Sequence, residues 1–333
     1  MNLGAQPSDS IQCQKWRAVF GSSAAMQEIY QLVKKFANYE FPVLILGETG
    51  TGKELIARTM HIWSARHTEP FIPVDCAALA PTLIESELFG YERGAFTGAD
   101  RPRMGLLESA NLGTIFLDEV DSLTLEMQAR LLRVLQEREI RPVGSTSSRT
   151  IKGRIIAASN QDLAHEVREN AFRQDLYFRL DVGRIRIPPL RDRKEDIPLL
   201  VDCFMEKYCE MNIAIHSMSQ DAMRLLKKYD WPGNVRELEN AIERALATSL
   251  GPTIQPQDLV LDTNGNLADE NVTLCELEHR AILNAVTTAS GNKLAAARSL
   301  GIGKTTLYRK LKQYAKEDRG FSSPTGQEPE QRN

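Results

Sequence analysis

The chain has 333 residues, of which 42% are hydrophobic, with 21 Gly and 15 Pro. This length suggests two or three domains, and the composition excludes the collagen-like, disordered and disulfide-scaffold classes. Lys and Arg total 41 against 44 Asp and Glu, so the net charge is −3. A uniformly basic coat for nucleic acid is therefore excluded, whereas a local basic patch is not.

Membrane and metal signals are weak throughout the sequence. No stretch approaches the roughly 20 apolar residues that cross a bilayer, and the first residues lack the charged and apolar regions of a signal peptide. The five cysteines never show CxxC spacing, and the five histidines show no ligand spacing. We therefore expect a reduced, cytoplasmic protein without a structural metal or a membrane partner.

The order of elements predicts an α/β core followed by helices. Short apolar runs at 41–46, 71–75, 114–118 and 154–158 alternate with helical periodicity over 25–36, 53–66 and 124–137. This alternation is typical of a doubly wound parallel sheet. Beyond 187–190 we expect no further strands, and three helices over 194–208, 219–229 and 234–248. The predicted segments are a leader (1–18), the α/β core (19–187), a helical subdomain (188–260), a linker (261–272), a second helical domain (273–316) and a disordered tail (317–333).

A glycine-rich turn joins the first strand to the next helix. Its glycines let backbone N–H groups converge on phosphate oxygens, and Lys53 adds a point charge at the helix start. Glu54 departs from the usual pattern, because a Ser or Thr that binds Mg²⁺ normally follows the lysine. The alternative is a simple turn with a solvated lysine. The candidate nucleotide-binding residues of this turn are Gly47, Glu48, Thr49, Gly50, Thr51, Gly52, Lys53 and Glu54.

Two carboxylates end the strand at 114–118. Ligands of open α/β sheets bind at the carboxyl ends of strands, so Asp118 is a candidate Mg²⁺ ligand and Glu119 a candidate for activating water. The alternative is a strand followed by a solvated acidic turn. The order of the two motifs favours an enzyme that hydrolyses nucleotide.

Arg236 is a third candidate for phosphate binding. Asn234 and Glu237 have the spacing of a helix N-cap and its N3 partner, which places Arg236 in a first helical turn. A cation there opposes the helix dipole, and a bound phosphate would reverse the sign of that effect. A surface salt bridge is the alternative.

Gly94 and Gly98 bracket a tight excursion that carries Phe96 and Thr97. By residue type alone, we expect Phe96 to fold back into the core. An aromatic ring on an exposed tip would instead need a partner that accepts it.

At this point the chain resembles the AAA+ ATPases that activate transcription by sigma-54 RNA polymerase, the family of nitrogen regulatory protein C. The resemblance runs from Val19 to Tyr314, and its most specific part is the run from Glu87 to Ala99, which contains GAFTGA. It implies an AAA+ P-loop core, a helical lid and a loop that contacts sigma-54. The loop residues are Gly94, Ala95, Phe96, Thr97, Gly98 and Ala99.

The resemblance also implies roles for single residues. Asn160 resembles the sensor of the γ-phosphate, and Arg236 lies in the second-sensor motif. Family members usually carry Asn at the position of Asp75, where it holds the catalytic glutamate. An ionised Asp accepts but cannot donate a hydrogen bond, which puts that switch role in doubt here.

Arg173 and Arg179 resemble the arginine fingers that reach a neighbouring subunit. Six residues apart on one helix, they would point about 120° from each other, so both cannot face one γ-phosphate. We favour Arg173 as the finger and expect that one of the two pairs with Asp175 or Asp181.

The C-terminal region predicts DNA binding. Residues 291–311 fit a helix, a glycine-containing turn and a second helix, and residues 290–320 hold eight Lys or Arg against two Asp or Glu, a local charge of +6. The spacing resembles the Fis-type helix-turn-helix of the family, in which one helix reads base edges. A basic hairpin for protein contact is the alternative. The candidate DNA-binding residues are Lys304, Thr305, Thr306, Tyr308, Arg309 and Lys312.

Taken together, the sequence predicts an ATP-dependent activator of sigma-54 RNA polymerase that binds enhancer DNA and forms a ring, with a hexamer expected. About 18 residues precede the ATPase core, so we expect no receiver domain and control by expression level or a trans-acting regulator. A DNA-binding repressor or sigma-70 regulator with an AAA+ scaffold is one alternative. An unfoldase or DNA-remodelling motor is another, although the sequence shows no pore signature or protease segment.

Overall fold

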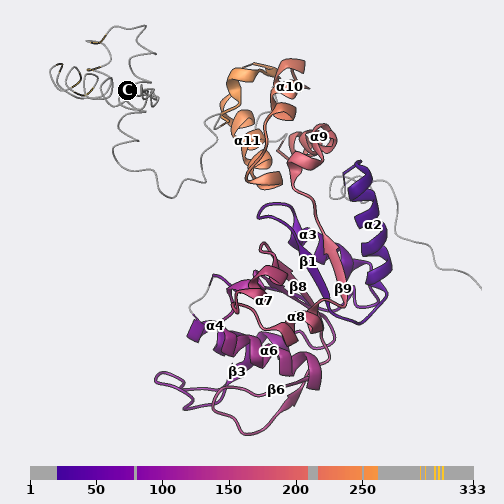
Figure 1. Ribbon diagram of the computed structural model, residues 1–333, viewed down its shortest axis with the longest axis vertical. Coiled ribbons are helices and arrows are strands. Elements are labelled where there is room, and N and C mark those ends of the chain that lie inside the picture. Colours follow the sequence, from indigo (N-terminus) through magenta and orange to yellow (C-terminus); the bar gives the residue numbers. More distant parts are fainter. Residues whose placement is uncertain are drawn as a thin grey trace, which may run out of the picture. The chain divides into compact units, whose positions relative to one another are not determined.

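The computed structural model describes residues 21–78, 81–208, 217–249 and 251–261, and five single positions near the C-terminus. The chain divides into two compact units, and the division falls after Leu261. The first unit holds an α/β core and a helical subdomain (Figure 1). None of the helices in the described ranges is both long and apolar enough to cross a bilayer.

Five parallel strands form the central sheet, in the order β2-β5-β8-β1-β9. The three central strands, β5, β8 and β1, are short and almost wholly buried, as expected for strands that are covered on both faces, whereas the edge strands β2 and β9 are partly exposed. The bounds are β1 Val43–Leu46, β2 Phe71–Asp75, β5 Thr114–Asp118, β8 Arg154–Ser159 and β9 Gly183–Arg186.

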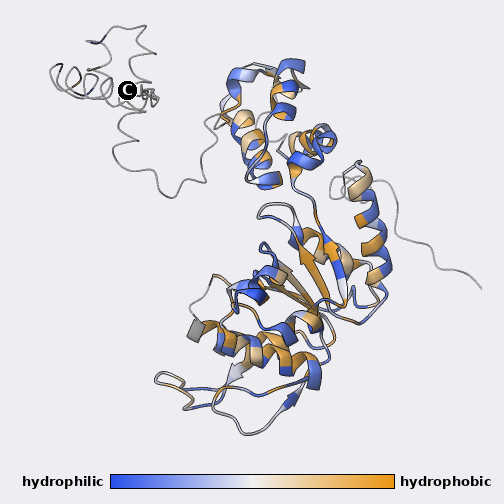
Figure 2. Cartoon of the chain, viewed as in Figure 1, coloured by the Kyte–Doolittle hydropathy of each residue, from blue (hydrophilic) through white to orange (hydrophobic). Residues whose placement is uncertain are grey.

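Side chains from the sheet alternate between two hydrophobic cores. In β5, Phe116 points into the core shared with α2 and α3, whereas Ile115 and Leu117 point into the core on the opposite face. This period of two follows from the pleat of the strand. Figure 2 shows the apolar strands enclosed between helices whose outer faces are hydrophilic. The helices of the core are α2 Ala24–Ala37, α3 Lys53–Ile62, α4 Pro81–Phe89, α5 Leu106–Ser109, α6 Leu125–Glu137, α7 Leu163–Arg168 and α8 Gln174–Leu180.

Two small antiparallel hairpins extend from the core. One pairs β3 (Gly90–Tyr91) with β4 (Arg103–Met104), and the other pairs β6 (Glu139–Ile140) with β7 (Arg149–Thr150). The first hairpin encloses the glycine-bracketed loop, so this loop lies outside the central sheet.

The helical subdomain packs α9 (Ile197–Tyr208), α10 (Gln220–Lys228) and α11 (Asn234–Thr248) around Trp231. The Trp231 ring is fully buried, and its Nε1–H donates to the Leu226 carbonyl oxygen at 2.8 Å. Short 3-10 turns at 120–122, 190–192, 194–196 and 256–258 link the elements of the first unit.

The predicted α/β fold class with trailing helices is confirmed, but two details are wrong. Strands do occur beyond residue 190, because β10 (Ser217–Met218) pairs with β11 (Thr253–Ile254). The helix predicted to reach residue 66 ends at Ile62, where Trp63 caps it. The sequence analysis also missed β9 and both hairpins.

Candidate active site

The phosphate loop, residues 47–52 between β1 and α3, folds over the amino group of Lys53. The Lys53 Nζ donates to the carbonyl oxygens of Gly47 at 2.8 Å and Glu48 at 3.3 Å. Gly50 and Gly52 have φ angles of +78° and +102°, which L side chains rarely adopt. Burial lowers the pKa of Lys53, whose side chain is 7% exposed. A lysine held this way at a helix N-terminus is suited to binding phosphate.

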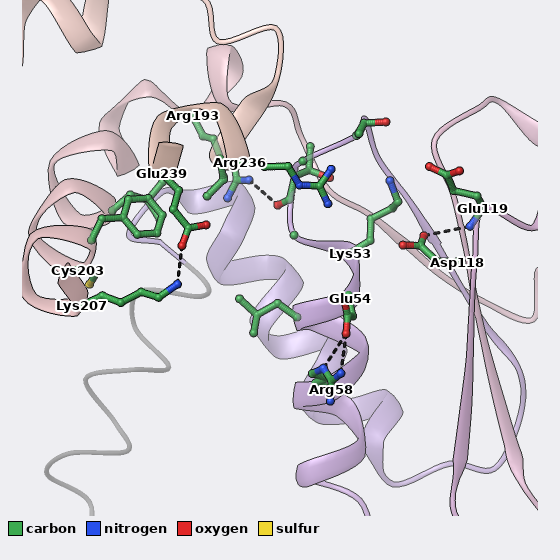
Figure 3. Close-up of a pocket in the computed structure, with 18 of the residues that line it drawn as sticks. Lys53, Glu54, Arg58, Asp118, Glu119, Arg193, Cys203, Lys207, Arg236 and Glu239 are labelled. Atoms are coloured by element: carbon green, nitrogen blue, oxygen red, sulfur yellow. Dashed lines mark hydrogen bonds and ion pairs between the residues drawn. The ribbon is translucent and has the colours of Figure 1, made fainter. Parts of the chain in front are cut away.

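A cavity of about 910 Å³ opens beside this loop. The loop, α3 and the end of β5 line one side, and α9 and the start of α11 line the other. In Figure 3 the Lys53 ammonium points to the side on which Asp118 and Glu119 lie, and Arg236 lies on the helical-subdomain side of the loop. The cavity thus brings cations from both parts of the first unit to one space.

The carboxyl end of β5 supplies the two predicted acids. Asp118 Oδ1 accepts a hydrogen bond from the Glu119 backbone N–H at 3.1 Å, and Glu119 has a φ angle of +53°. Burial raises the pKa of both carboxyl groups, while the Lys53 charge opposes this effect. A left-handed residue that is not glycine is a strained feature of the kind that clusters at functional sites.

Asp75 lies beside these acids, because β2 pairs with β5 and aligns Asp75 with Asp118. Its negative charge contributes to the raised pKa of Glu119. Its own Oδ1 accepts from the backbone N–H groups of Ala77 at 2.9 Å and Ala78 at 3.1 Å. Asp75 therefore closes a turn and donates no hydrogen bond to Glu119.

Asn160 follows β8 and connects the phosphate loop with Glu119. Its Nδ2 donates to Glu119 Oε1 at 3.4 Å and to Thr49 Oγ1 at 3.3 Å. The side-chain amide that donates to Glu119 is therefore that of Asn160, and position 75 supplies no such donor. Among the described residues, Asn160 Oδ1 is one of four buried side-chain atoms without a hydrogen-bond partner.

The predicted N-cap of α11 is wrong. The cap is Gly233, whose N–H donates to Glu237 Oε2 at 2.8 Å, and Asn234 is the first helical residue, with a φ angle of +55°. The Asn234 side chain is fully buried and bonds to the phosphate loop, so it is not available to cap its own helix. Arg236 still lies in the first turn and lines the cavity, as predicted.

Arg173 and Arg179 do not lie on one helix, which corrects the sequence interpretation. Arg173 precedes α8 as its N-cap residue, in extended conformation, and its guanidinium pairs with Asp175 at 2.7 Å. Arg179 lies within α8 and donates to the Leu135 carbonyl oxygen at 3.2 Å. The Arg173 backbone N–H, which has no acceptor within α8, donates to the Gln128 side chain at 2.8 Å. Neither arginine lines the cavity of its own chain.

The loop from Gly94 to Ala99 is closed by a hydrogen bond from Gly94 N–H to the Ala99 carbonyl oxygen at 2.9 Å. Both Gly94 and Gly98 have positive φ angles. Phe96 is 46% exposed, and its ring centroid lies 4.9 Å from that of Tyr91 in β3. The expectation from residue type alone, that Phe96 enters the core, is therefore wrong.

Two arginines that follow the central sheet also contact the phosphate loop, although the sequence did not predict them. Arg191 pairs with Glu48, and Arg193 donates from Nη2 to the Thr51 carbonyl oxygen at 3.2 Å. Glu54 faces away from the phosphate loop and pairs with Arg58 one turn later. The only signal was the run of charged residues after Pro189, which gives no partner by itself.

Little of the predicted DNA-binding surface is described. Lys304 is helical and exposed, and Ala297 and Leu307 are helical and buried. The remaining candidates lie outside the described residues: Thr305, Thr306, Tyr308, Arg309 and Lys312.

The parallel sheet, the phosphate loop and the helical lid together define an AAA+ ATPase. Residues 19–186 match the sigma-54 interaction domain, residues 191–273 the AAA+ ATPase lid domain, and residues 273–314 the Fis family of bacterial regulatory proteins. The chain belongs to the sigma-54-dependent transcriptional activators, and it is an AAA+ ATPase with a Fis-type DNA-binding domain. The match supports this function over that of a repressor or sigma-70 regulator.

Known relatives share most of the chain. The transcriptional regulatory protein ZraR of Salmonella typhimurium is 47% identical over 299 residues, which cover 88% of this chain and 68% of ZraR. The regulator NtrC of Proteus hauseri is 41% identical over 334 residues, covering 90% and 70%. A crystal structure of NtrX from Brucella abortus in complex with ATP has a TM-score of 0.69 and 31% identity, covering 91% of this chain and 71% of NtrX.

Proposed function

We propose that this chain binds ATP in the cavity between core and lid, hydrolyses it between the subunits of a ring, and moves the Gly94–Ala99 loop against sigma-54. The observation that carries the proposal is the convergence of Lys53, Arg236 and Glu119 on one cavity. The ATP complex of NtrX, whose fold is similar, supports ATP as the nucleotide.

Magnesium fits the donors at this site. Mg²⁺ is commonly held by one or two carboxylates together with substrate phosphates and waters, and Asp118 lines the cavity and interacts electrostatically with Lys53. No cluster of three or more metal-ligating side chains occurs in the described ranges, so the phosphates would supply the other ligands. When bound, the ion would neutralise charge on the phosphates.

The hydrolytic step assigns a separate task to each side chain. Lys53 and Arg236 hold the phosphate oxygens, and Glu119 takes a proton from the attacking water. The water oxygen bonds to the γ-phosphorus while the bond to the β–γ bridging oxygen breaks, which releases phosphate and ADP. Asn160 contacts Glu119, and this contact supports a role for its amide in detecting the γ-phosphate.

The exposed position of Arg173 supports assembly into a ring. Its guanidinium is 41% exposed and does not line the cavity of its own chain, so we assign it to the nucleotide of a neighbouring subunit. Arg173 would first leave Asp175. Arg179 bonds to a backbone carbonyl and is the weaker candidate. We propose a hexamer, as in AAA+ rings of this kind.

The loop and the C-terminal region supply the two macromolecular contacts. The exposed Phe96 and the adjacent Thr97 would meet sigma-54, since an aromatic side chain on a tip gains most when a partner buries it. Lys304 and the predicted residues of the second helix would bind enhancer DNA, with basic side chains on phosphates. A cytoplasmic location and a trans-acting regulator complete the proposal.

Two substitutions test the assignment of the cavity. Lys53→Ala should abolish ATP binding, because the phosphates lose their point charge. Glu119→Gln should retain binding and lose hydrolysis, because the attacking water loses its base. Calorimetric binding and phosphate release measured on both variants decide the matter, and hydrolysis at the wild-type rate by Glu119→Gln would remove that residue from catalysis.

A further inference from the structure

Glu48 attaches the phosphate loop directly to the lid, which is the helical subdomain that follows the central sheet. Arg191 donates from Nη1 to Glu48 Oε2 at 2.8 Å and from Nη2 to Oε1 at 2.5 Å. Asn234 Nδ2 donates to the same Oε2 at 3.1 Å. These bonds hold the pKa of Glu48 below its usual value, chiefly through Arg191. Although Glu48 lies within the phosphate loop, both of its carboxylate oxygens are engaged by the lid.

Asn234 continues the connection along the backbone. Its Nδ2 also donates to the Thr49 carbonyl oxygen at 3.0 Å, and its Oδ1 accepts from the Leu190 N–H at 2.8 Å. The Asn234 side chain is fully buried, and the backbone of Asn234 adopts a strained left-handed conformation at this position. The Asn234 amide thus joins the phosphate loop to the segment that carries Arg191 and to the helix that carries Arg236.

The first turn of α11 completes the junction. The N–H groups of Val235 and Arg236 both donate to the Gly50 carbonyl oxygen, at 3.0 and 3.2 Å. A Cβ on Gly50 would lie 2.3 Å from the Gly233 carbonyl oxygen, so only glycine permits this approach. These N–H groups are consequently used by the protein and are not available to bind an anion. Phosphate binding from this helix must come from the Arg236 side chain.

We propose that Glu48, Arg191 and Asn234 are positioning residues that fix the Arg236 guanidinium relative to Lys53. Figure 3 shows Arg236 and Lys53 entering the cavity from opposite sides of the phosphate loop. Asn234 and Arg236 share the first turn of α11, and Glu48 lies in the loop that leads to Lys53, so the junction links the backbones of Arg236 and Lys53 before any nucleotide binds. Glu48, predicted from the sequence as a nucleotide contact, is thereby reassigned to the lid. The inference rests on the proposed role of Arg236 in phosphate binding.

A double-mutant cycle with Arg236 tests this role. Arg191→Gln and Glu48→Gln each remove the charge pair while leaving side chains of similar size. Each should weaken the binding of a non-hydrolysable ATP analogue by roughly tenfold, within the range of coupling between residues in contact. In an Arg236→Gln background the same changes should weaken binding by less than about twofold, because the group they position is already lost.

Asp221→Asn is the matched control. Asp221 pairs with Arg224 at 3.0 Å within α10 of the same subdomain, both side chains are largely exposed, and neither residue lines the cavity. This variant should bind the analogue as the wild type does. Melting temperatures without nucleotide identify any variant that fails to fold, and either Arg191→Gln or Glu48→Gln alone then suffices for the cycle.

Two results would separate the inference from the function on which it rests. Full, additive losses in the Arg236→Gln background would show that Glu48 and Arg191 act independently of Arg236, which overturns the inference. Wild-type affinity in Arg236→Gln itself would instead remove Arg236 from the proposed function. Loss confined to the backgrounds that retain Arg236 supports both.

Discussion

At the scale of single residues, Asn160 and Asp75 lie close enough to Glu119 to control it. Only Asn160 offers a hydrogen-bond donor, whereas Asp75 contributes negative charge and holds a turn. In the family the donor is expected at position 75. We therefore propose that Asn160, which also contacts the phosphate loop, restrains Glu119 in this chain.

A matched pair of substitutions distinguishes these two roles. Asn160→Ala removes the bonds to Glu119 and Thr49, so we expect kcat for ATP hydrolysis to fall by about tenfold or more with ATP affinity little changed. Asp75→Asn keeps the oxygen that accepts from the turn, and it should change kcat by less than about threefold. Steady-state hydrolysis and ATP titration check both. A larger effect from Asp75→Asn would return the switch to position 75.

At the scale of secondary-structure elements, His61 forms a contact between α3 and β5 that we expect to depend on pH. It lies in α3, is 5% exposed, and its Nδ1 is 2.9 Å from Thr114 Oγ1 in β5. Burial lowers the pKa of His61 below its usual value. As the pH falls below about 6.5, the unfolded chain binds a proton that the folded chain does not, so folding loses stability.

His61→Gln should therefore make stability less dependent on pH between 7 and 5. The amide can still bond to Thr114 but does not titrate. Urea unfolding at several pH values measures the slope, and His165→Gln, a change at an exposed position in α7, should keep the wild-type slope. Equal slopes for wild type and His61→Gln would show that His61 does not titrate with folding.

A substitution in the loop Gly94–Ala99 should separate ATP hydrolysis from the opening of a sigma-54 promoter. Thr97 is exposed and does not line the cavity. Thr97→Ala should retain ATP hydrolysis and lose the opening of a sigma-54 promoter in a purified system. Wild-type promoter opening by this variant would make Thr97 an ordinary turn residue.

Local patterns predicted the elements that local forces determine. The apolar runs of β2 and β5 and the glycine-rich turn before α3 were correctly placed, because each has a complete signal in its own sequence. β9 was missed because only Gly183 and Ile185 face inward, which is too short an alternation to detect. The two-residue strands exist only through their partners.

The errors at the site have the same origin. Asn234 has the sequence signature of an N-cap, but its contacts with Thr49 and Leu190 override that local preference. Arg173 was expected on a helix, but it precedes α8 and its backbone N–H donates to a side chain of α6. Both outcomes depend on residues about 44 or more positions away in the chain, which periodicity cannot reveal.

At the scale of the whole molecule, the division after Leu261 predicts separable activities. A chain ending at Leu261 retains the complete cavity, so it should hydrolyse ATP but fail to bind enhancer DNA. In the intact chain, Arg309→Ala or Lys312→Ala should each flatten the salt dependence of DNA binding by about one unit, as expected for one lost phosphate contact. Salt-titrated binding assays check this, and unchanged slopes would favour a protein-contact role.

The proposed function requires that ATP hydrolysis by this chain drives promoter opening by sigma-54 holoenzyme. The most direct measurement is open-complex formation with purified sigma-54 holoenzyme on a promoter that carries an upstream site for this chain. We predict that the wild-type chain with ATP opens the promoter, that Glu119→Gln with ATP does not, and that sigma-70 holoenzyme gives no response. Opening without ATP, or equal opening by Glu119→Gln, would contradict the account.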